Sequence, residues 1–464
     1  MNYSRRSFLG GAAVLSLASV SGSETGSGIA DTDCVVEPTR KLPVAAACDV
    51  IVVGGGPAGI AAAVSAARAG AKVRLLELQG SLGGIWTSGL MGCVFDFDKS
   101  SIDREIIRRL DACGARSPRH PVPAFKDAKN ASWRSNFVYE PERMRIVCEE
   151  MCAEAGVRFT LQCPVVAAMR GKDGRKLSAV VTESKSGRQA WKAKCFIDCS
   201  GDGDLAALSG CGYDVGYGPD RVDQPASLVA LVWVPDDPAL ARFAVNDPST
   251  YGPNRRQTVN PKKELLAELR RAGISPSYSD PTLFRLRSGL CALMANHEYG
   301  LRMDDAQAIT DATVRARAEV SRLVDALDAL GGPWKGTRVI LTAEQIGHRG
   351  ARRIHGRATV TVEDVAAGRT WPDGVTTSNA GIDIHALTYA SNEKQAAGQT
   401  FGASFRPFQI PLDALRAKDA DNLFMAGRCI SGDFIAQASY RMTGSAVAMG
   451  EAAGRAAAQL VLKR

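Results

Sequence analysis

Blocks of apolar and polar residues near the start of the chain predict a strand, a glycine turn, a helix and a second strand. Residues 49–53 form a short, β-branched apolar run, which is typical of a buried parallel strand. Residues 60–69 are rich in alanine and contain no helix breaker, so they favour a helix, which Gly70 ends. A second apolar run at 72–76 completes a β-α-β unit.

The turn between the first strand and the helix reads GGGPAG and fits the spacing G-x-G-x-x-G. Gly54 allows a tight turn, Gly56 lets the backbone approach a pyrophosphate, and Gly59 lets the helix pack close to the strand. The second strand ends at Glu77, where a carboxylate can accept the hydroxyl groups of an adenosine ribose. An ordinary glycine-rich turn is the alternative. The complete succession favours a dinucleotide, and the acid argues against NADP.

The remaining blocks predict further elements. We expect helices at 103–110, 139–155, 310–330 and 445–462, strands at 157–161 and 423–426, and an antiparallel meander of strands at 165–169, 177–183 and 190–198. Helical spacing predicts core positions in two of these helices: Met144, Val147 and Met151 in the first, and Val314, Ala318, Leu323 and Leu327 in the second. In the last helix, Gly450 and Gly454 permit close packing against a neighbour.

A second glycine turn follows the meander. Gly201, Gly203 and Ala206 also fit a nucleotide-binding spacing, which would mean a second dinucleotide and a reductase driven by NAD(P)H. Gly210 and Gly212 interrupt the helix that follows, and no strand ending in an acid stands about 20 residues further on. We therefore favour a single dinucleotide.

The N-terminal segment, residues 1–30, has the pattern of an export signal. Arg5 and Arg6 form a twin-arginine pair, followed by a short, weakly apolar run at 10–20 and small polar residues. The run is too short to span a bilayer. These features predict a folded protein that the twin-arginine export machinery delivers to the periplasm or otherwise outside the cytoplasm, with no integral membrane segment after the signal is removed. A tail with two chance arginines is the alternative.

Charge and cysteine content exclude several function classes. The formal net charge is +8, but Lys and Arg are spread without a basic run that contains aromatic residues, so we expect no nucleic-acid partner. The chain has 12 cysteines and no C-x-x-C motif, so we expect neither an iron–sulfur cluster nor another metal site. An oxidising compartment would allow some of the cysteines to pair.

Three segments resemble one family. LGGIWTSGL at 82–90, FIDCSGDGDLAA at 196–207 and NLFMAGRCIS at 422–431 resemble, in the same order, segments of bacterial FAD-dependent oxidoreductases related to the fumarate reductase and succinate dehydrogenase flavoproteins. The segment RGARRIHG at 349–356 is similar to another family motif, although Gly350 and Ala351 replace a Glu-Ser pair there. The likeness extends from about residue 48 to the C-terminus and implies FAD as the cofactor.

The resemblance implies an α/β fold, in which a Rossmann-like FAD-binding domain of the ββα-sandwich type with an antiparallel meander carries an inserted α+β substrate domain. We expect the FAD-binding domain at 48–212, with an inserted segment at about 99–138, the substrate or cap domain at 213–400, and the rest of the FAD-binding domain at 401–464. The glycine motif and the resemblance together give the expected FAD contacts: Gly54, Gly56, Pro57, Ala58, Gly59, Glu77, Gly83, Gly84, Thr87, Gly201, Asp202, Gly427, Arg428 and Ser445.

Catalytic candidates lie in the substrate half and near the last helix. His385 is the first choice for proton transfer, because its segment IDIH resembles a family motif; His348 and then His297 follow. Arginines could hold an anionic substrate, and we name Arg353 and Arg441 first, with Arg349, Arg352 and Arg406 as further candidates. For each of these residues a purely structural role is the alternative.

We therefore expect an enzyme that transfers a hydride between a small organic substrate and flavin N5, as a dehydrogenase or oxidase with an unidentified electron acceptor. One alternative is a fumarate-reductase-like reductase fed by an electron carrier. Another is a non-catalytic protein that only retains flavin.

Overall fold

The computed structural model describes residues 35, 37–118, 136–235, 238–247, 250, 258–350 and 352–462. The chain divides into two units, Met1–Lys41 and Leu42–Arg464. All helices and strands named below belong to the second unit. The predicted export signal at 1–30 lies outside the described residues.

The largest sheet has seven strands in the order β6-β2-β1-β9-β8-β7, with β18 paired to β9 as well. Its strands are β1 (Val44–Val53), β2 (Val73–Leu76), β6 (Arg158–Thr160), β7 (Val165–Arg170), β8 (Leu177–Ser184), β9 (Gly187–Asp198) and β18 (Leu423–Met425). The pairs among β6, β2, β1, β9 and β18 are parallel, whereas β7 and β8 are antiparallel. The predicted α/β class with an antiparallel meander is confirmed.

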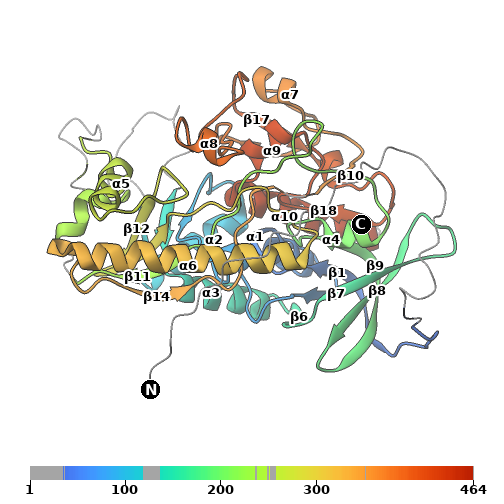
Figure 1. The fold of residues 1–464 in the computed structure, drawn as a ribbon. Coiled ribbons are helices and arrows are strands. Elements are labelled where there is room, and N and C mark those ends of the chain that lie inside the picture. The colour runs from blue at the N-terminus through green and yellow to red at the C-terminus, as the bar shows by residue number, and fades with distance from the viewer. Residues whose placement is uncertain are drawn as a thin grey trace. The chain divides into compact units, whose positions relative to one another are not determined.

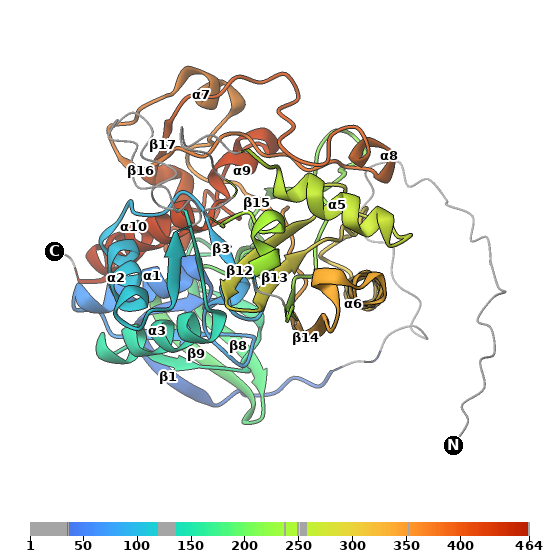
Figure 2. The same ribbon diagram turned by 90° about the vertical axis from the view of Figure 1, so that its left-hand side faces the viewer.

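Two helices that are far apart in the sequence lie side by side against one face of this sheet (Figures 1 and 2). These are α1 (Pro57–Arg68) and α10 (Thr443–Leu462). A Cβ atom on Gly450 would lie 2.1 Å from the carbonyl oxygen of Ala58, and one on Gly454 would lie 2.3 Å from that of Ala62. The two glycines therefore permit the close helix contact that the sequence predicts, and this contact joins the first and last parts of the fold.

The helices α2 (Ser101–Ala112) and α3 (Pro141–Glu154) pack beside this pair. The prediction of a helix from residue 139 was wrong at its start. Tyr139 belongs to β5 (Phe137–Tyr139), because Pro141 occupies the first helical position and its fixed backbone angle begins the helix there. The predicted core residues Met144, Val147 and Met151 are buried. A small sheet joins β5 to β3 (Cys93–Val94) and β4 (Arg116–Pro118).

A second, antiparallel sheet has the order β12-β13-β11-β14. Its strands are β11 (Ala230–Trp233), β12 (Thr282–Arg287), β13 (Leu290–Met294) and β14 (Arg338–Thr342). The helices α5 (Pro261–Arg271) and α6 (Ala306–Leu330) pack against it, and α6 is the long helix across the front of Figure 1.

The predicted buried stripe of α6 was wrong in part. Leu323 and Leu327 are buried, but Val314 is 58% exposed and Ala318 is exposed as well. The step from 318 to 323 is five residues, which turns a helix to a different face, so the four positions never formed one stripe. The buried face has the regular three- and four-residue spacing of Ala312, Ala316, Val320, Leu323, Val324 and Leu327.

The remaining elements are short. They are α4 (Asp204–Leu208), α7 (Val362–Ala367), α8 (Tyr389–Asn392), α9 (Phe434–Tyr440), β10 (Tyr213–Asp214), β15 (Arg353–Ile354), β16 (Gly374–Ser378) and β17 (Phe408–Pro411), with the 3-10 helices Gly84–Trp86, Pro238–Phe243, Gly332–Trp334 and Leu412–Leu415. Within the described parts of the chain, no helix is both long and apolar enough to cross a membrane. No disulfide joins two of the described cysteines.

Within the described ranges, buried apolar side chains form three clusters. The largest surrounds the seven-stranded sheet and includes Ile354, Ile384 and Phe408, whereas the other two lie around the second sheet and α6. The segment that contains Ile354 and Ile384 therefore packs with the first sheet. The domain limits given above stay a prediction.

Candidate functional site

Four parallel strands end at the same edge of the large sheet, and the loops that follow them meet there. β1 leads to Gly54, β2 to Glu77, β9 to Gly201 and β18 to Gly427. In α/β sheets, ligands bind outside the carboxyl ends of the strands, where neighbouring loops diverge. This edge is therefore the candidate cofactor site.

The contacts of the glycines show how tightly these loops meet. A Cβ atom on Gly54 would lie 2.4 Å from the carbonyl oxygen of Cys199. A Cβ atom on Gly201 would lie 3.0 Å from the guanidinium of Arg428, and one on Gly427 would lie 3.5 Å from Cβ of Ala58. Loops from the first and last parts of the fold thus meet at this edge. The turn at Gly201 leads only into the five-residue helix α4, which supports the single dinucleotide expected here.

Gly56 differs from its two neighbours in the motif. Gly54 and Gly59 have backbone atoms directly against them, whereas a Cβ atom on Gly56 would meet no atom within 4 Å. Gly56 is also the N-cap of α1, and no side chain accepts a hydrogen bond from the first N–H groups of the helix at this position. Open space in front of a helix N-terminus, where N–H groups point outward, suits a pyrophosphate.

Glu77 lies at the end of β2 and is buried. One carboxylate oxygen accepts a hydrogen bond from the backbone N–H of Gly55, and the other accepts one of 2.7 Å from the N–H of Gln79. Each oxygen keeps a further lone pair for a hydroxyl donor. Burial raises the pKa of Glu77, and the backbone donors oppose that effect.

The loop after β2 covers the first glycine turn. A Cβ atom on Gly84 would lie 2.9 Å from Cα of Gly56, and Gly83 has a positive φ of 106° with Thr87 directly against it. The hydroxyl group of Thr87 donates to the carbonyl oxygen of Leu82 at 2.6 Å. Gly83 and Gly84 are therefore needed for the loop's close approach, and the Thr87 hydroxyl stabilises the loop itself.

The other expected cofactor residues take part in polar contacts within the protein. Asp202 and Arg428 form an ion pair of 2.6 Å. Ser445 lies in the first turn of α10, and its hydroxyl group is within hydrogen-bond distance of the Lys99 ammonium and the Asp96 carboxylate. Lys99 and Asp96 are also ion-paired, so this buried cluster anchors the start of α10.

His385, the first catalytic candidate, has protein partners at both ring nitrogens. Its Nδ1 lies 3.2 Å from Nε2 of His297, and its Nε2 lies 3.4 Å from the carboxylate of Asp383. Burial, and then the charge of Arg349, lower the pKa of His385 to about 3. The imidazole is therefore neutral at physiological pH.

Two arginines lie beside this group. Arg441 donates to the backbone oxygen of Asp383 at 2.8 Å and is 3.2 Å from its carboxylate. Arg349 is buried and donates to the carbonyl oxygen of Pro225 at 2.6 Å and to the hydroxyl oxygen of Ser227 at 3.0 Å. Burial and the charge of Arg441 lower the pKa of Arg349 to about 10, so the guanidinium still carries its charge at neutral pH.

His348 and Arg353 lie in a second group, around Asp223. His348 is buried, neither of its ring nitrogens has a hydrogen-bond partner among the described residues, and its Nε2 is 3.8 Å from Asp223. Arg353 donates to the carbonyl oxygen of Gly216 at 2.9 Å, but its Nε and Nη1 atoms have no such partner within the described ranges. Burial raises the pKa of Asp223 to about 6, and it lowers that of His348 to about 4.

Electrostatic interactions link the two groups and the cofactor edge. Besides burial, the charge of Asp202 raises the pKa of His348 and that of Arg428 lowers it. Besides burial, the charge of Arg428 lowers the pKa of Arg441 and that of Asp223 raises it. All four residues expected to be catalytic, His385, His348, Arg353 and Arg441, thus belong to one set of interacting groups. Arg352 instead pairs with the exposed Asp204, and Arg406 is exposed near Gly368, so these two candidates stand apart.

Residues 49–464 match the profile of the family described as FAD dependent oxidoreductase. The chain belongs to this family. It is also 45% identical over 69 residues to the thiamine thiazole synthase of Methanosarcina mazei, which covers 15% of this chain and 25% of that enzyme. The matched part therefore spans a quarter of that curated relative's length.

The solved structures similar to this FAD-dependent oxidoreductase that follow have low sequence identity and TM-scores below 0.5. A geranylgeranyl bacteriochlorophyll reductase-like protein of Thermoplasma acidophilum is 15% identical, with a TM-score of 0.46, covering 90% of this chain and 78% of the other. The p-nitrophenol 4-monooxygenase of Pseudomonas putida is 12% identical, with a TM-score of 0.47, covering 90% and 81%. Likeness of this degree says nothing about the substrate.

The cofactor edge of this FAD-dependent oxidoreductase fits FAD. The space at Gly56 suits the pyrophosphate, and the unused lone pairs of Glu77 suit the ribose. Three buried polar atoms from other segments have no hydrogen-bond partner in the described structure: Trp86 Nε1, Gln437 Oε1 and Thr443 Oγ1. A bound flavin nucleotide would offer partners to groups of this kind.

Sequence reasoning missed several members of the site. Asp383, Tyr278, Tyr299, Asp223 and Gln224 were not among the candidates, although each contacts or acts on one of them. Asp383 offered a signal, because it stands two residues before His385 in the IDIH segment. The others come from segments with no recognisable pattern.

Proposed function

We propose that this FAD-dependent oxidoreductase oxidises a small organic substrate that carries a negative charge, in the dehydrogenase or oxidase direction. Arg349 supports this proposal more than any other residue. It is buried, and no carboxylate of a described residue forms an ion pair with it. A buried cation without a counter-ion is costly unless the protein is built to receive an anion.

The charges around Arg349 favour one anion. Arg349 and Arg441 contribute two positive charges, and Asp383 is the one carboxylate among the described residues that pairs with either. The neighbouring His385 and the charges of both arginines lower the pKa of Asp383 despite its burial. Asp383 is therefore ionised, and the pair retains about one positive charge for a substrate carboxylate or similar group.

Substrate oxidation also requires a proton acceptor, and we assign this role to Nε2 of His385. When bound, FAD supplies the acceptor for the two electrons that leave the substrate carbon as a hydride. His385 is neutral, and in the tautomer with its proton on Nδ1 the lone pair of Nε2 can accept the proton of a substrate hydroxyl or ammonium group. An anion between Arg349 and Arg441 would offset the positive charge that lowers the His385 pKa, and so would make this residue a stronger base.

The test is anaerobic mixing of the purified flavoprotein with small 2-hydroxy and 2-amino acids and with their uncharged amides. We expect an acid to bleach the visible flavin absorbance, and its amide to need about 100-fold higher concentration, because a hydrogen bond to a charged group contributes roughly 1.5–3 kcal/mol. Bleaching by dithionite but by none of a broad panel would contradict the proposal. Reoxidation of the reduced protein by an unsaturated acid would instead favour the fumarate-reductase-like alternative and its implied relationship.

We also propose that the enzyme acts outside the cytoplasm. Arg5, Arg6 and the short apolar run after them support export in the folded state, with FAD taken up first. A separate electron acceptor would then be required in that compartment.

A further inference from the structure

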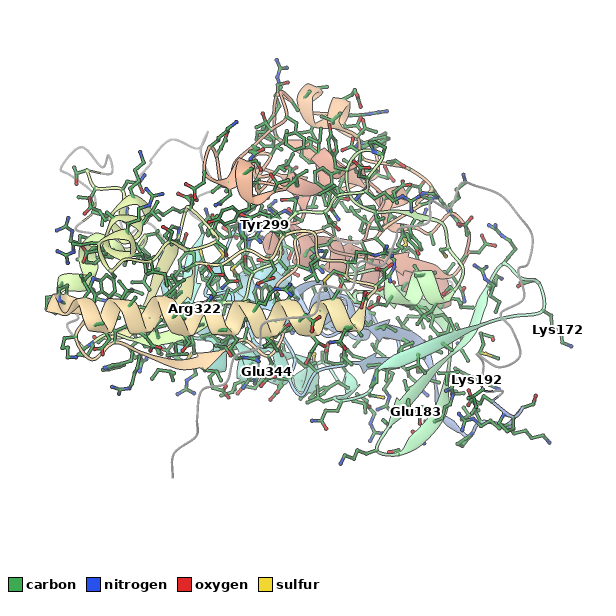
Figure 3. The ribbon with its side chains drawn as sticks, viewed as in Figure 1. Lys172, Glu183, Lys192, Tyr299, Arg322 and Glu344 are labelled. Atoms are coloured by element: carbon green, nitrogen blue, oxygen red, sulfur yellow. The ribbon has the colours of Figure 1, made fainter. Side chains whose placement is uncertain are left out.

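A continuous line of hydrogen-bonding groups leads from the arginine pair toward the surface. It begins at His385 Nε2 beside Asp383, and His385 Nδ1 lies 3.2 Å from His297 Nε2. His297 Nδ1 lies 3.2 Å from the hydroxyl oxygen of Tyr299, which lies 3.0 Å from the carbonyl oxygen of Ser277. Both histidines are buried, whereas Tyr299, labelled in Figure 3, is only half-buried in the loop between β13 and α6.

The surrounding residues hold the two imidazole rings in place. The ring of Tyr278 lies 4.1 Å from that of His297 and 5.6 Å from that of His385, both at a tilted angle. The backbone N–H of His297 donates to the hydroxyl oxygen of Ser277 at 2.8 Å, and that of His385 donates to Gln224 at 3.0 Å. The distances along the line are therefore set by packing and by backbone contacts on both sides.

Elementary hydrogen-bond rules allow two continuous arrangements from His385 Nδ1 outward when both histidines are neutral, because each ring then has one N–H and one lone pair. They differ at His385 Nε2, which turns a lone pair toward Asp383 in the first and an N–H in the second. In the first, both rings carry the proton on Nδ1: His385 donates to His297, His297 donates to Tyr299, and Tyr299 donates to Ser277. In the second, both carry it on Nε2: Tyr299 donates to His297, His297 donates to His385, and His385 donates to Asp383. Mixed arrangements set two donors or two lone pairs against each other.

We propose that His385, His297 and Tyr299 form a relay that carries one proton per turnover between the anion site and the solvent. This inference rests on the proposed function, since that reaction releases the proton. His297 and Tyr299 act through His385, so they are positioning residues.

Each bond change in the relay is balanced. A substrate proton forms an N–H bond at His385 Nε2, and the proton on His385 Nδ1 moves to His297 Nε2. The proton on His297 Nδ1 then moves to the Tyr299 oxygen, whose original O–H proton leaves to water. The first arrangement becomes the second, with one proton gained at the inner end and one lost at the outer end. A proton entering at Tyr299 restores the first arrangement by the reverse transfers, and the proton on His385 Nε2 then leaves at the inner end to the electron acceptor that reoxidises the protein.

The tautomers of the two histidines test the relay without turnover. The chain has five histidines, so ¹⁵N-histidine labelling of the flavin-loaded protein gives few signals, and the variants His297→Gln and His385→Gln assign the two of interest. Long-range ¹H–¹⁵N correlation should show both imidazoles neutral with the proton on the same ring atom. Nδ1 in both leaves the lone pair of His385 Nε2 for the substrate proton, whereas Nε2 in both would rule out Nε2 as its acceptor. Opposite tautomers would overturn the relay, even if the enzyme oxidises its substrate.

Proton release provides the second test. With an acid that bleaches the flavin, a pH-indicator dye in weak buffer should report release as fast as bleaching in the wild type. In Tyr299→Phe, we expect release to slow by about 10-fold or more, with the half-saturating substrate concentration unchanged, because one link of general acid–base transfer is lost. Tyr389→Phe is the matched control, since its ring contacts that of Tyr299 at 6.3 Å but lies outside the relay.

The outcomes separate the two proposals. Equal release rates in Tyr299→Phe and Tyr389→Phe would overturn the relay while leaving substrate oxidation intact. A failure of every substrate to bleach the flavin would contradict the proposed function. The tautomers of His297 and His385 would still show whether both rings carry the proton on the same ring atom, as the relay requires.

Discussion

A Cβ atom on Gly59 would lie 1.8 Å from the carbonyl oxygen of Gly54, far inside van der Waals contact, whereas one on Gly56 would meet no atom within 4 Å. Gly59→Ala should therefore force α1 away from β1 and destabilise the protein by about 1–3 kcal/mol or more. Gly56→Ala should leave the flavin-free protein as stable as the wild type, because its φ of −75° suits alanine. Thermal unfolding of the flavin-free proteins measures both effects.

FAD binding separates the same two variants. Gly56→Ala should weaken FAD binding at least 10-fold although the fold is intact, because the added methyl group occupies the space assigned to the pyrophosphate. Unchanged FAD affinity in Gly56→Ala would remove that assignment. Unchanged stability in Gly59→Ala would mean that the helix and strand are less closely packed than described.

Glu77→Gln tests the ribose contact. Glutamine keeps the size of the side chain but has one carbonyl oxygen, so it loses an acceptor and the negative charge. We expect the dissociation constant of FAD to rise by about 10-fold, since a hydrogen bond to a charged group contributes roughly 1.5–3 kcal/mol and glutamine retains part of it. Equilibrium dialysis with flavin fluorescence measures the constant, and an unchanged value would contradict the role of Glu77.

The cofactor edge could be predicted because its signals are local. Three short sequence patterns mark this edge: the motif from Gly54 to Gly59, the acid after the second strand, and the glycines of α10. Each pattern spans only a few residues, and periodicity places it on a defined helix or strand. Their contacts in the fold follow from parallel pairing, since the ends of β1, β9 and β18 lie at one edge. The turn at Gly201 therefore needed no long-range information.

The catalytic group lacked such signals. His385 and His297 come from segments 88 residues apart, and Tyr278 and Gln224 from further separate segments, so only tertiary packing brings them together. Family resemblance drew attention to His385 and Arg353 but could not show that both nitrogens of His385 are engaged. The wrong stripe on α6 has a different origin, because Val314 and Ala318 were grouped with residues of another helical face.

Arg349→Met should weaken binding of the anionic substrate by about 100-fold while leaving FAD content unchanged, because the uncompensated guanidinium supplies charged hydrogen bonds of roughly 1.5–3 kcal/mol. Substrate-induced bleaching at increasing concentration measures the effect. Arg352→Met is the matched control, since Arg352 stands three residues away in the same motif and pairs with Asp204 at 2.8 Å. Equal losses in the two variants would argue against an anion site at Arg349.

Replacing Arg5 and Arg6 together by lysine should retain the protein in the cytoplasm, because the twin-arginine machinery reads the guanidinium pair rather than the charge alone. Fractionation of cells that express the full-length protein gives the measurement. Arg270 and Arg271 provide the control, since they form another adjacent and exposed pair, and their replacement by lysine should leave export unchanged. Normal export of the Arg5/Arg6 variant would point to a different route.

The pH dependence of stability should report the burial of His348. Its pKa in the folded protein is lowered to about 4 by burial, whereas an unfolded chain has the ordinary value of about 6.5. Between these values the unfolded chain binds a proton that the folded protein does not, so His348 makes the free energy of unfolding fall as pH falls, by about 1.4 kcal/mol per pH unit. The buried Asp223 contributes a slope of opposite sign, because its pKa is raised to about 6.

His348→Gln removes one of these groups and leaves the other in place. Urea unfolding of the flavin-saturated proteins at pH 6.5, 5.5 and 4.5 should give the variant a slope that is less steep, on falling pH, by about one proton, or about 1.4 kcal/mol per unit. Glutamine also supplies polar atoms where the two ring nitrogens lack protein partners, so the variant should fold. Identical slopes would mean that the His348 ring takes up a proton in the folded state at its ordinary pKa, so that a dry protein interior does not surround it.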